Sequence, residues 1–397
     1  MDAQEIAKAK LENMGKVNLC FLPTPFEKMA KLSAQFKGVN LFFKRDDQTG
    51  LAMGGNKARK LEYIMADVRQ QKATSIITWG GFHSNWCRQV AAAANICNVK
   101  PVLILLKKPG RSATAADDVT KRYSSHKEFS NKTKFMSNDS LEGSATAAGE
   151  VLNGNPLLDF LMDAEIHVRE VGKDQKLIEL AGIKEDIIDP VFKEEQEKGN
   201  NPYIAPIGGS LLEGSMLRPW GALGYVNAFV EVLEQAKSRQ IPIDTVVVAS
   251  GSSGTQAGLL AGAKIFSPET RVVGISVMAD KATLNRYIET IADETFVELG
   301  VDMKIEEDDI IVFDEYTKEG YGVLNQEIAS AIRLAAQSEG VLLDPVYTGK
   351  GMAGLTDLIN KGYFRDGENI VFFHTGGTPS LFPYGSELKE FLSPTFL

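Results

Sequence analysis

Short apolar segments alternate along this chain with segments of helical periodicity. The apolar segments are bounded by turn residues and rich in β-branched side chains; they cover residues 75–79, 102–106, 245–249, 271–277 and 369–373. Continuous apolar runs of this kind are typical of strands that are buried on both faces. Their alternation with helices predicts an α/β fold with open, doubly wound parallel sheets, whose ligands bind at the carboxyl ends of the strands.

One predicted helix begins at a lysine that follows two glycines. The helix is indicated by apolar residues three and four positions apart, namely Leu61, Ile64, Met65 and Val68. Gly54 and Gly55 lack side chains, so a planar group can approach the backbone before Lys57. A lysine in this place is suited to forming an imine with an aldehyde cofactor. An ordinary solvated lysine in a turn is the alternative interpretation.

Two stretches interrupt the alternation and are predicted to be polar surface insertions. They lie near residues 110–153, which are rich in Ser, Thr, Ala, Lys and Asn, and near residues 190–201, which are strongly charged. Solvated decoration, partly helical, is the favoured interpretation. A lid or an oligomer contact is the alternative.

Length, charge and cysteine content narrow the class of protein. The 397 residues exceed the size of about 250–300 at which single cores stop growing, so more than one domain is expected. A net charge of −9 argues against nucleic acid as a partner. Three cysteines without paired spacing, and the lack of a signal sequence or a long apolar run, predict a soluble cytoplasmic protein without a membrane partner.

A loop after the predicted strand 245–249 is rich in glycine and hydroxyl residues and opens a helix. Its sequence Ser252-Ser253-Gly254-Thr255 would present several backbone N–H groups at the positive end of the helix dipole. The loop lacks the lysine of a nucleotide P-loop and the spacing of a dinucleotide fingerprint. It therefore predicts a site for one phosphate group, with a purely structural glycine turn as the alternative.

A second loop occupies the equivalent place after strand 75–79. It contains His83, Ser84, Asn85 and Trp86. Ser84 and Asn85 make a plausible helix N-cap, and the same exposed N–H groups and hydroxyl could bind a substrate carboxylate. His83 is one of four histidines, and its position in this loop favours the active-site interpretation over a structural role.

Hydroxyl groups in glycine-rich contexts complete the candidate site. Tyr321 lies between two glycines, and Tyr347 lies in the segment 343–350. Each is either a packed loop residue or a phenol available for proton transfer. Thr375 follows the predicted strand 369–373, where its hydroxyl could meet a ligand ring.

Taken together, these segments resemble the fold type II, or tryptophan synthase β-like, pyridoxal phosphate enzymes. The closest resemblance is to the branch that contains D-cysteine desulfhydrase and 1-aminocyclopropane-1-carboxylate deaminase. The segments that carry it occur in order at residues 22–26, 44–47, 54–57, 59–62, 84–85, 251–255, 343–349 and 374–377.

The resemblance implies pyridoxal 5'-phosphate as cofactor and no metal. Lys57 would bind the cofactor aldehyde, Asn85 its phenolic oxygen, and Ser252 to Thr255 its phosphate, with Thr375 near the pyridine nitrogen. Ser84 would contact the substrate carboxylate, and Tyr321 and Tyr347 would be the active-site tyrosines. A homodimer is the usual form. The resemblance also implies a larger cofactor domain, residues 1–60 and 215–397, and a smaller domain, residues 61–214.

Two positions separate the activities within this branch. The deaminase pattern has an acidic residue after the second tyrosine and a leucine after the histidine, whereas this chain has Thr348 and Thr375. Neutral hydroxyls give a milder electron sink than a carboxylate that keeps the pyridine protonated. The sequence therefore predicts β-elimination from a small amino acid, most simply D-cysteine.

Alternatives remain open at the substrate. Relatives carry Ile-Gln before the Ser-Asn pair and a histidine after it, whereas Phe82, His83 and Trp86 stand at these positions here, and they would change the pocket that selects the substrate. The alternatives are 1-aminocyclopropane-1-carboxylate deaminase, another small-amino-acid lyase such as a cysteate sulfo-lyase, and a catalytically silent cofactor-binding protein.

Overall fold

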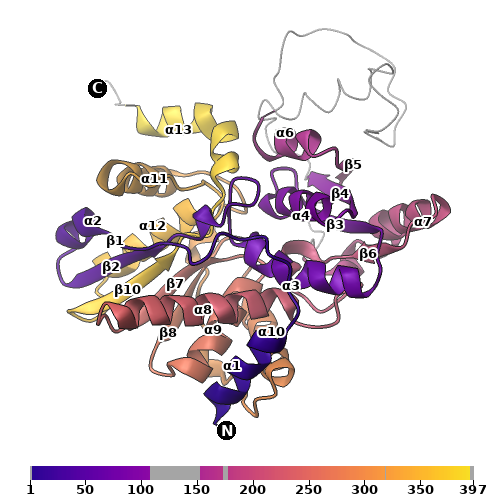
Figure 1. The fold of residues 1–397 in the computed structure, drawn as a ribbon. Coiled ribbons are helices and arrows are strands. Elements are labelled where there is room, and N and C mark those ends of the chain that lie inside the picture. The colour runs from indigo at the N-terminus through magenta and orange to yellow at the C-terminus, as the bar shows by residue number, and fades with distance from the viewer. Residues whose placement is uncertain (1, 108–152, 173–177, 318, 394–397) are drawn as a thin grey trace.

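Two β-sheets flanked by helices make up the computed structural model of the chain, which describes residues 2–107, 153–172, 178–317 and 319–393 (Figure 1). In this part of the chain the helices are α1 (Ala3–Asn13), α2 (Ala30–Gln35), α3 (Lys57–Gln70), α4 (Asn85–Ile96), α6 (Gly154–Leu161), α7 (Asp189–Glu197), α8 (Trp220–Ser238), α9 (Gly254–Phe266), α10 (Lys281–Leu299), α11 (Gln326–Glu339), α12 (Thr348–Asn360) and α13 (Gly385–Leu392). The predicted helices at Lys57 and at residues 85–96 are confirmed.

The larger sheet has six strands in the order β1-β2-β10-β7-β8-β9. Their bounds are Phe26–Lys28, Val39–Lys44, Glu368–Phe373, Thr245–Ser250, Arg271–Ser276 and Ile311–Phe313. All neighbours pair in parallel except β1, which runs antiparallel to β2 at the edge of the sheet. The predicted parallel sheet is therefore confirmed for all but this edge strand, which is too short to show a strand pattern in the sequence.

Alternate residues of the larger sheet face two different cores. Val246 and Val248 pack with α8, α9 and α10, whereas Val247 and Val273 pack with α11 and α12. Figure 1 shows α8 and α9 on one side of this sheet and α11 and α12 on the other. Because both faces are covered, the strands read as continuous apolar runs, and the sheet is doubly wound as predicted.

The smaller sheet has four parallel strands in the order β5-β4-β3-β6. Their bounds are Glu165–Glu170, Lys100–Lys107, Ser75–Gly81 and Pro202–Ile204. Side chains of α3 and α4 share one core with the face that includes Leu103, while Ile188 and Val191 cover the face that includes Trp79. Helices thus cover both faces of this sheet as well.

The charged stretch near residues 190–201 requires a correction. It is helical, as expected, but its helix α7 packs on the smaller sheet rather than standing out as decoration, because Val191 and Glu195 are buried. The Glu195 carboxylate pairs with the ammonium groups of Lys100 at 2.7 Å and Lys198 at 2.9 Å. Polar composition misled the prediction, since a carboxylate paired with two lysines can be buried.

All strands of the smaller sheet lie within residues 61–214, and those of the larger sheet lie outside that range. The domain boundaries themselves stay a prediction, and α3 runs through residue 60. Nearly all of the predicted insertion at 110–153 lies outside the described residues. None of the described helices is long and apolar enough to cross a membrane.

Candidate active site

A cavity of about 910 Å³ lies where the carboxyl ends of β3, β7 and β10 meet. It brings together the predicted site residues from segments far apart in the sequence. Those that line it are Lys57, His83, Ser84, Asn85, Trp86, Ser252, Ser253, Thr255, Tyr321, Tyr347 and Thr375. Gly254 is the remaining predicted residue, and it is the first residue of α9 directly behind this lining.

Lys57 is the first residue of α3 and extends into the cavity. The preceding loop requires glycine, because Gly54 has a φ of +69° and a Cβ there would lie 1.9 Å from the Asp47 carbonyl oxygen. The Lys57 ammonium donates to Asn56 Oδ1 at 2.8 Å. Burial lowers the pKa of Lys57 to about 8, with Asp344 opposing the shift and Arg88 adding to it. About a tenth of this amine is therefore unprotonated and nucleophilic at pH 7, far more than at its usual pKa.

The loop from Ser252 to Thr255 forms the N-terminus of α9. Ser253 holds the left-handed conformation, with φ of +67°, and its buried Oγ has no partner among the described residues. Ser252 Oγ lies 2.8 Å from Ser210 Oγ. Backbone N–H groups at a helix N-terminus and an orphaned hydroxyl together form a site for an anion.

Lys60 lies beneath this loop, and the sequence interpretation missed it. Its ammonium donates to the Gly208 carbonyl at 2.9 Å and to Ser210 Oγ at 3.2 Å, and a Cβ on Gly254 would lie 3.1 Å from it. Among the described residues no carboxylate pairs with Lys60, although it is buried. Burial lowers the pKa of Lys60 well below its usual value, and the Lys57 charge adds to this shift. A buried cation without a counter-ion fits a bound anion.

Asn56 connects the two parts just described. Its Oδ1 accepts from Lys57 Nζ, and its Nδ2 donates to Thr255 Oγ1 at 3.0 Å. This amide therefore fixes the distance between the lysine and the anion-binding loop.

Ser84 caps α4 on the opposite side of the cavity. Its Oγ accepts from the Cys87 N–H at 3.1 Å, so the predicted N-cap is confirmed. The first turn of α4 also borders the cavity through Asn85 and Trp86. A carboxylate can bind at such a helix terminus beside the serine hydroxyl.

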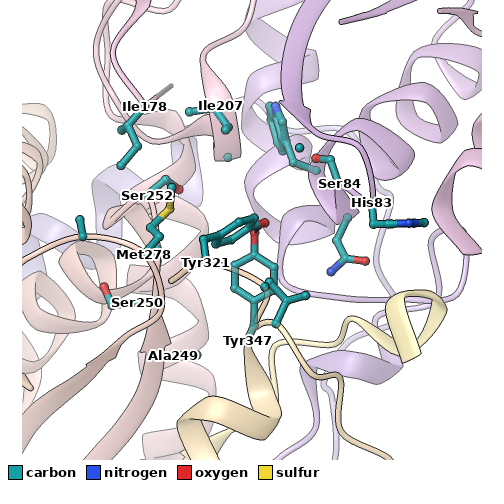
Figure 2. Close-up of a pocket in the computed structure, with 18 of the residues that line it drawn as sticks. His83, Ser84, Ile178, Ile207, Ala249, Ser250, Ser252, Met278, Tyr321 and Tyr347 are labelled. Atoms are coloured by element: carbon teal, nitrogen blue, oxygen red, sulfur yellow. Dashed lines mark hydrogen bonds between the residues drawn. The ribbon is translucent and has the colours of Figure 1, made fainter. Parts of the chain in front are cut away.

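Trp86 and His83 line this side of the cavity, and their contact with a substrate stays a prediction. The Trp86 indole N–H already donates to Thr78 Oγ1 at 2.6 Å, and a Cβ on Gly209 would lie 2.9 Å from the ring. The Trp86 ring thus forms part of the lining of the cavity. The His83 ring points away from Tyr321 and Tyr347 (Figure 2).

The two predicted tyrosines meet in the centre of the cavity. Their hydroxyl oxygens lie 2.6 Å apart, and their rings form an edge-to-face pair (Figure 2). Lys57 Nζ lies 5.8 Å from the centroid of the Tyr347 ring. Burial raises the pKa of Tyr347 to about 12, so its phenol stays protonated at neutral pH. The pair can therefore hold and pass a proton near the lysine.

A buried carboxylate holds the turn that presents Tyr347. Asp344 accepts from the N–H groups of Val346, Tyr347 and Thr348 at 2.8 to 3.0 Å, and from Thr348 Oγ1 at 2.7 Å. Four donors satisfy this carboxylate within its own turn.

Comparisons with known proteins agree with this geometry. The family described as "Pyridoxal-phosphate dependent enzyme" matches residues 17–122 and 162–376. A putative 1-aminocyclopropane-1-carboxylate deaminase of Pyrococcus abyssi is 35% identical over 97% of this chain and 98% of its own length. A D-cysteine desulfhydrase of Serratia proteamaculans is 37% identical over 94% of this chain and 97% of its own.

The chain belongs to the pyridoxal-phosphate dependent enzymes.

Solved structures agree with this assignment. The structure of a 1-aminocyclopropane-1-carboxylate deaminase homologue has a TM-score of 0.76 with 32% identity, covering 97% of this chain and 99% of that one. Diaminopropionate ammonia lyase of Escherichia coli has a TM-score of 0.57 at 14% identity, which shows the shared fold.

The cofactor of this enzyme is pyridoxal phosphate, and the described residues fit it. Lys57 has the lowered pKa that an amine needs to bind the aldehyde at neutral pH. The orphaned Ser253 hydroxyl and the unpaired Lys60 ammonium match the phosphate. The signal for Lys60 was present in the sequence, since a residue three positions after Lys57 shares its helix face.

Proposed function

We propose that this enzyme eliminates the β-substituent of a small amino acid, with D-cysteine as the first candidate. The products would be pyruvate, ammonia and hydrogen sulfide, with one water consumed. Relatives named D-cysteine desulfhydrase and 1-aminocyclopropane-1-carboxylate deaminase are about equally similar to the chain, so the choice depends on residues of the site.

The observation that carries the proposal is that hydroxyl side chains, and not a carboxylate, stand at the two positions that separate the activities of this branch. Thr348 and Thr375 are neutral, and the Thr348 hydroxyl is engaged by Asp344. The Asp344 carboxylate is itself satisfied by four donors. Without an acid to keep a pyridine nitrogen protonated, the electron sink is mild. A mild sink suffices when a good leaving group departs, as a thiol does.

The side chains divide the work as follows. The bound cofactor delocalises the electron pair that remains when the α-proton is removed. Lys57 Nζ takes that proton as a free amine, consistent with its pKa of about 8. Tyr347, or Tyr321 through their 2.6 Å contact, delivers a proton to the departing sulfur. Ser84 and the first turn of α4 hold the substrate carboxylate, which fixes the α-carbon beside the lysine.

We also propose that the enzyme is a cytoplasmic homodimer with the two domains expected from its sequence. Three free cysteines, Cys20, Cys87 and Cys97, are consistent with a reducing compartment. The dimer is supported by the resemblance alone, and sedimentation of the purified enzyme tests it.

A substrate panel tests the activity. The purified enzyme with pyridoxal phosphate is incubated with D-cysteine, L-cysteine, β-chloroalanine, cysteate, diaminopropionate and 1-aminocyclopropane-1-carboxylate, and ketoacid, ammonia and sulfide are measured. We expect the highest kcat/KM with D-cysteine and equimolar sulfide and pyruvate. 2-Oxobutyrate from 1-aminocyclopropane-1-carboxylate as the main product would contradict the proposal and assign the ring-opening reaction instead.

A further inference from the structure

The side-chain amide of Asn85 accepts hydrogen bonds from two residues that belong to none of the motifs described above. Its Oδ1 accepts from Asn155 Nδ2 at 2.9 Å and from Ser380 Oγ at 3.3 Å. Asn85 lines the cavity and is 9% exposed. Because Oδ1 is engaged on the far side, Nδ2 is the end left for the cavity, and it donates to no group of the described chain.

The direction of this amide follows from a carbonyl that can only accept. Asn155 Nδ2 also donates to the main-chain carbonyl of His83 at 2.7 Å. A reversed Asn155 would place its oxygen against that carbonyl, so Asn155 must present its nitrogen here. Asn85 must then direct its Oδ1 toward Asn155 Nδ2. The His83 carbonyl therefore fixes the orientation of the Asn155 amide and, through it, the orientation of the Asn85 amide.

Close packing keeps both supporting residues in place. Asn155 is the second residue of α6, Ser380 lies in the short helix η7 (Thr378–Tyr384), and both are fully buried. Gly154 permits this contact, because a Cβ there would lie 2.9 Å from both the Pro379 carbonyl oxygen and Pro383 Cγ. In sequence α6 precedes β5 of the smaller sheet and η7 follows β10 of the larger one, so the contact joins segments of both.

We propose that Asn155 and Ser380 are positioning residues that set the orientation of the Asn85 amide toward the cofactor. With this orientation Asn85 donates an N–H to the phenolic oxygen of bound pyridoxal phosphate. The opposite orientation would bring an amide oxygen against that oxygen. The inference rests on the role that the family resemblance implies for Asn85, namely that it faces the phenolic oxygen, and not on the substrate chosen in the proposed function.

The test reverses the polarity at residue 155 without changing its size. In Asn155→Asp the ionised carboxylate can only accept and is repelled by the His83 carbonyl, so the bond that holds Asn85 Oδ1 is lost. The Asn85 amide is then expected to turn its nitrogen toward residue 155 and its oxygen toward the cofactor. We expect pyridoxal phosphate to bind at least about tenfold more weakly, the cost of a lost hydrogen bond to a charged group. The absorbance maximum of the bound cofactor should shift in the same direction as in Asn85→Ala.

Two further variants make the result decisive. Asn95→Asp is the control, because Asn95 Nδ2, like Asn155 Nδ2, donates to a main-chain carbonyl at 2.7 Å, that of Met162, and Asn95 lies on α4, the helix of Asn85. It should leave the absorbance and the affinity unchanged. Ser380→Ala removes a hydroxyl that can donate to Asn85 Oδ1 at 3.3 Å or to the His83 carbonyl at 3.4 Å and that accepts from Asn155 Nδ2 at 3.0 Å. It should shift both the absorbance and the affinity in the direction of Asn155→Asp, by a smaller amount. If Asn155→Asp does not fold, Ser380→Ala decides the question.

A purely structural role predicts a different pattern. It would lower the unfolding temperature of the cofactor-free variants and leave the absorbance and affinity of the holoenzyme unchanged, and this result would overturn the proposal. Unchanged absorbance in Asn85→Ala would also overturn it. Ketoacid release by the wild-type enzyme tests the proposed function separately, so the two failures are distinguishable.

Discussion

Two strand-to-helix junctions border the cavity, and they are built differently. At the β3–α4 junction, Ser84 uses its own hydroxyl to cap the helix. At the β7–α9 junction, no side chain caps the helix, Ser253 holds a left-handed conformation, and buried Lys60 lies behind the first turn. Figure 2 shows Ser84 and Ser252 on opposite sides of Tyr321.

The difference shows what each junction can bind. The uncapped junction leaves its N–H groups available and adds a buried positive charge, which suits a phosphate that stays in place. The capped junction satisfies one N–H internally, and the buried Arg88 of its helix donates to the Ala52 and Gly54 carbonyls, which suits a carboxylate that must enter and leave. We therefore expect changes at β7–α9 to affect the affinity for the cofactor, and changes near β3–α4 to affect substrate binding and turnover.

The largest effect is expected at the tyrosine pair between the two junctions. Tyr347→Phe removes a hydroxyl that lies 2.6 Å from that of Tyr321 and that, in the proposed mechanism, delivers the proton to the leaving group. We expect kcat to fall by about 10²- to 10⁴-fold, the range for removing a general acid. The affinity for pyridoxal phosphate should change little. The control Tyr316→Phe loses a bond to Asp357 away from the cavity and should keep full kcat.

The next effect belongs to the β7–α9 junction. Lys60→Met keeps most of the buried volume and removes the charge, so the apparent dissociation constant of pyridoxal phosphate should rise by about 10- to 100-fold. At saturating cofactor the KM for substrate should stay the same. Lys264→Met is the control on α9 itself, since Lys264 pairs with Asp309 outside the cavity. A raised KM with unchanged cofactor affinity would reverse the assignment of the two junctions.

A smaller effect is expected at the β3–α4 junction. Ser84→Ala should raise the KM for the amino acid by about tenfold and reduce the free energy of unfolding by about 0.5–2 kcal/mol through loss of the N-cap. Asn325→Ala removes the equivalent cap of α11, where Asn325 accepts from the Ile328 N–H at 2.9 Å. The two variants should lose similar stability by chemical denaturation. If Ser84→Ala and Asn325→Ala have the same KM, Ser84 acts only as the cap of α4 and does not bind the substrate.

The smallest effect is the pH dependence that is expected from Lys57. Burial lowers the pKa of Lys57 in the folded protein to about 8 from its usual 10.5. Between these values the unfolded chain holds a proton that native Lys57 has lost, so the stability of the cofactor-free protein rises with pH in this window. The rate of cofactor capture should rise about fivefold from pH 7 to 8, following the free amine. Stopped-flow absorbance checks this, and a midpoint near 10.5 would contradict it.

Much of this could be predicted from local sequence patterns. The helix at Lys57 and the helix at residues 85–96 follow from apolar spacing and from a serine cap, both of which act within a few residues. The loop 252–255 follows from its glycine and hydroxyl content after an apolar strand. Each of these features is encoded in neighbouring residues, so the pattern and the structure agree.

Other parts depend on contacts between distant segments. Asn155 and Ser380 contact Asn85 only because α6 packs on η7, and no hydrophobic periodicity in the sequence predicts that contact. The indole N–H of Trp86 donates to Thr78 of β3, a contact that no local pattern predicts. The burial of Glu195 likewise depends on Lys100, 95 residues away. Tertiary pairing decides such cases, and composition alone pointed the wrong way.

Chemical reduction of the holoenzyme tests the central claim most directly. Borohydride treatment fixes pyridoxal phosphate to the lysine that holds it, and mass spectrometry of proteolytic peptides identifies that residue. The account predicts a pyridoxyl group on Lys57, with neighbouring Lys60 unmodified. A pyridoxyl group on Lys60, or on a lysine outside the cavity, would contradict it.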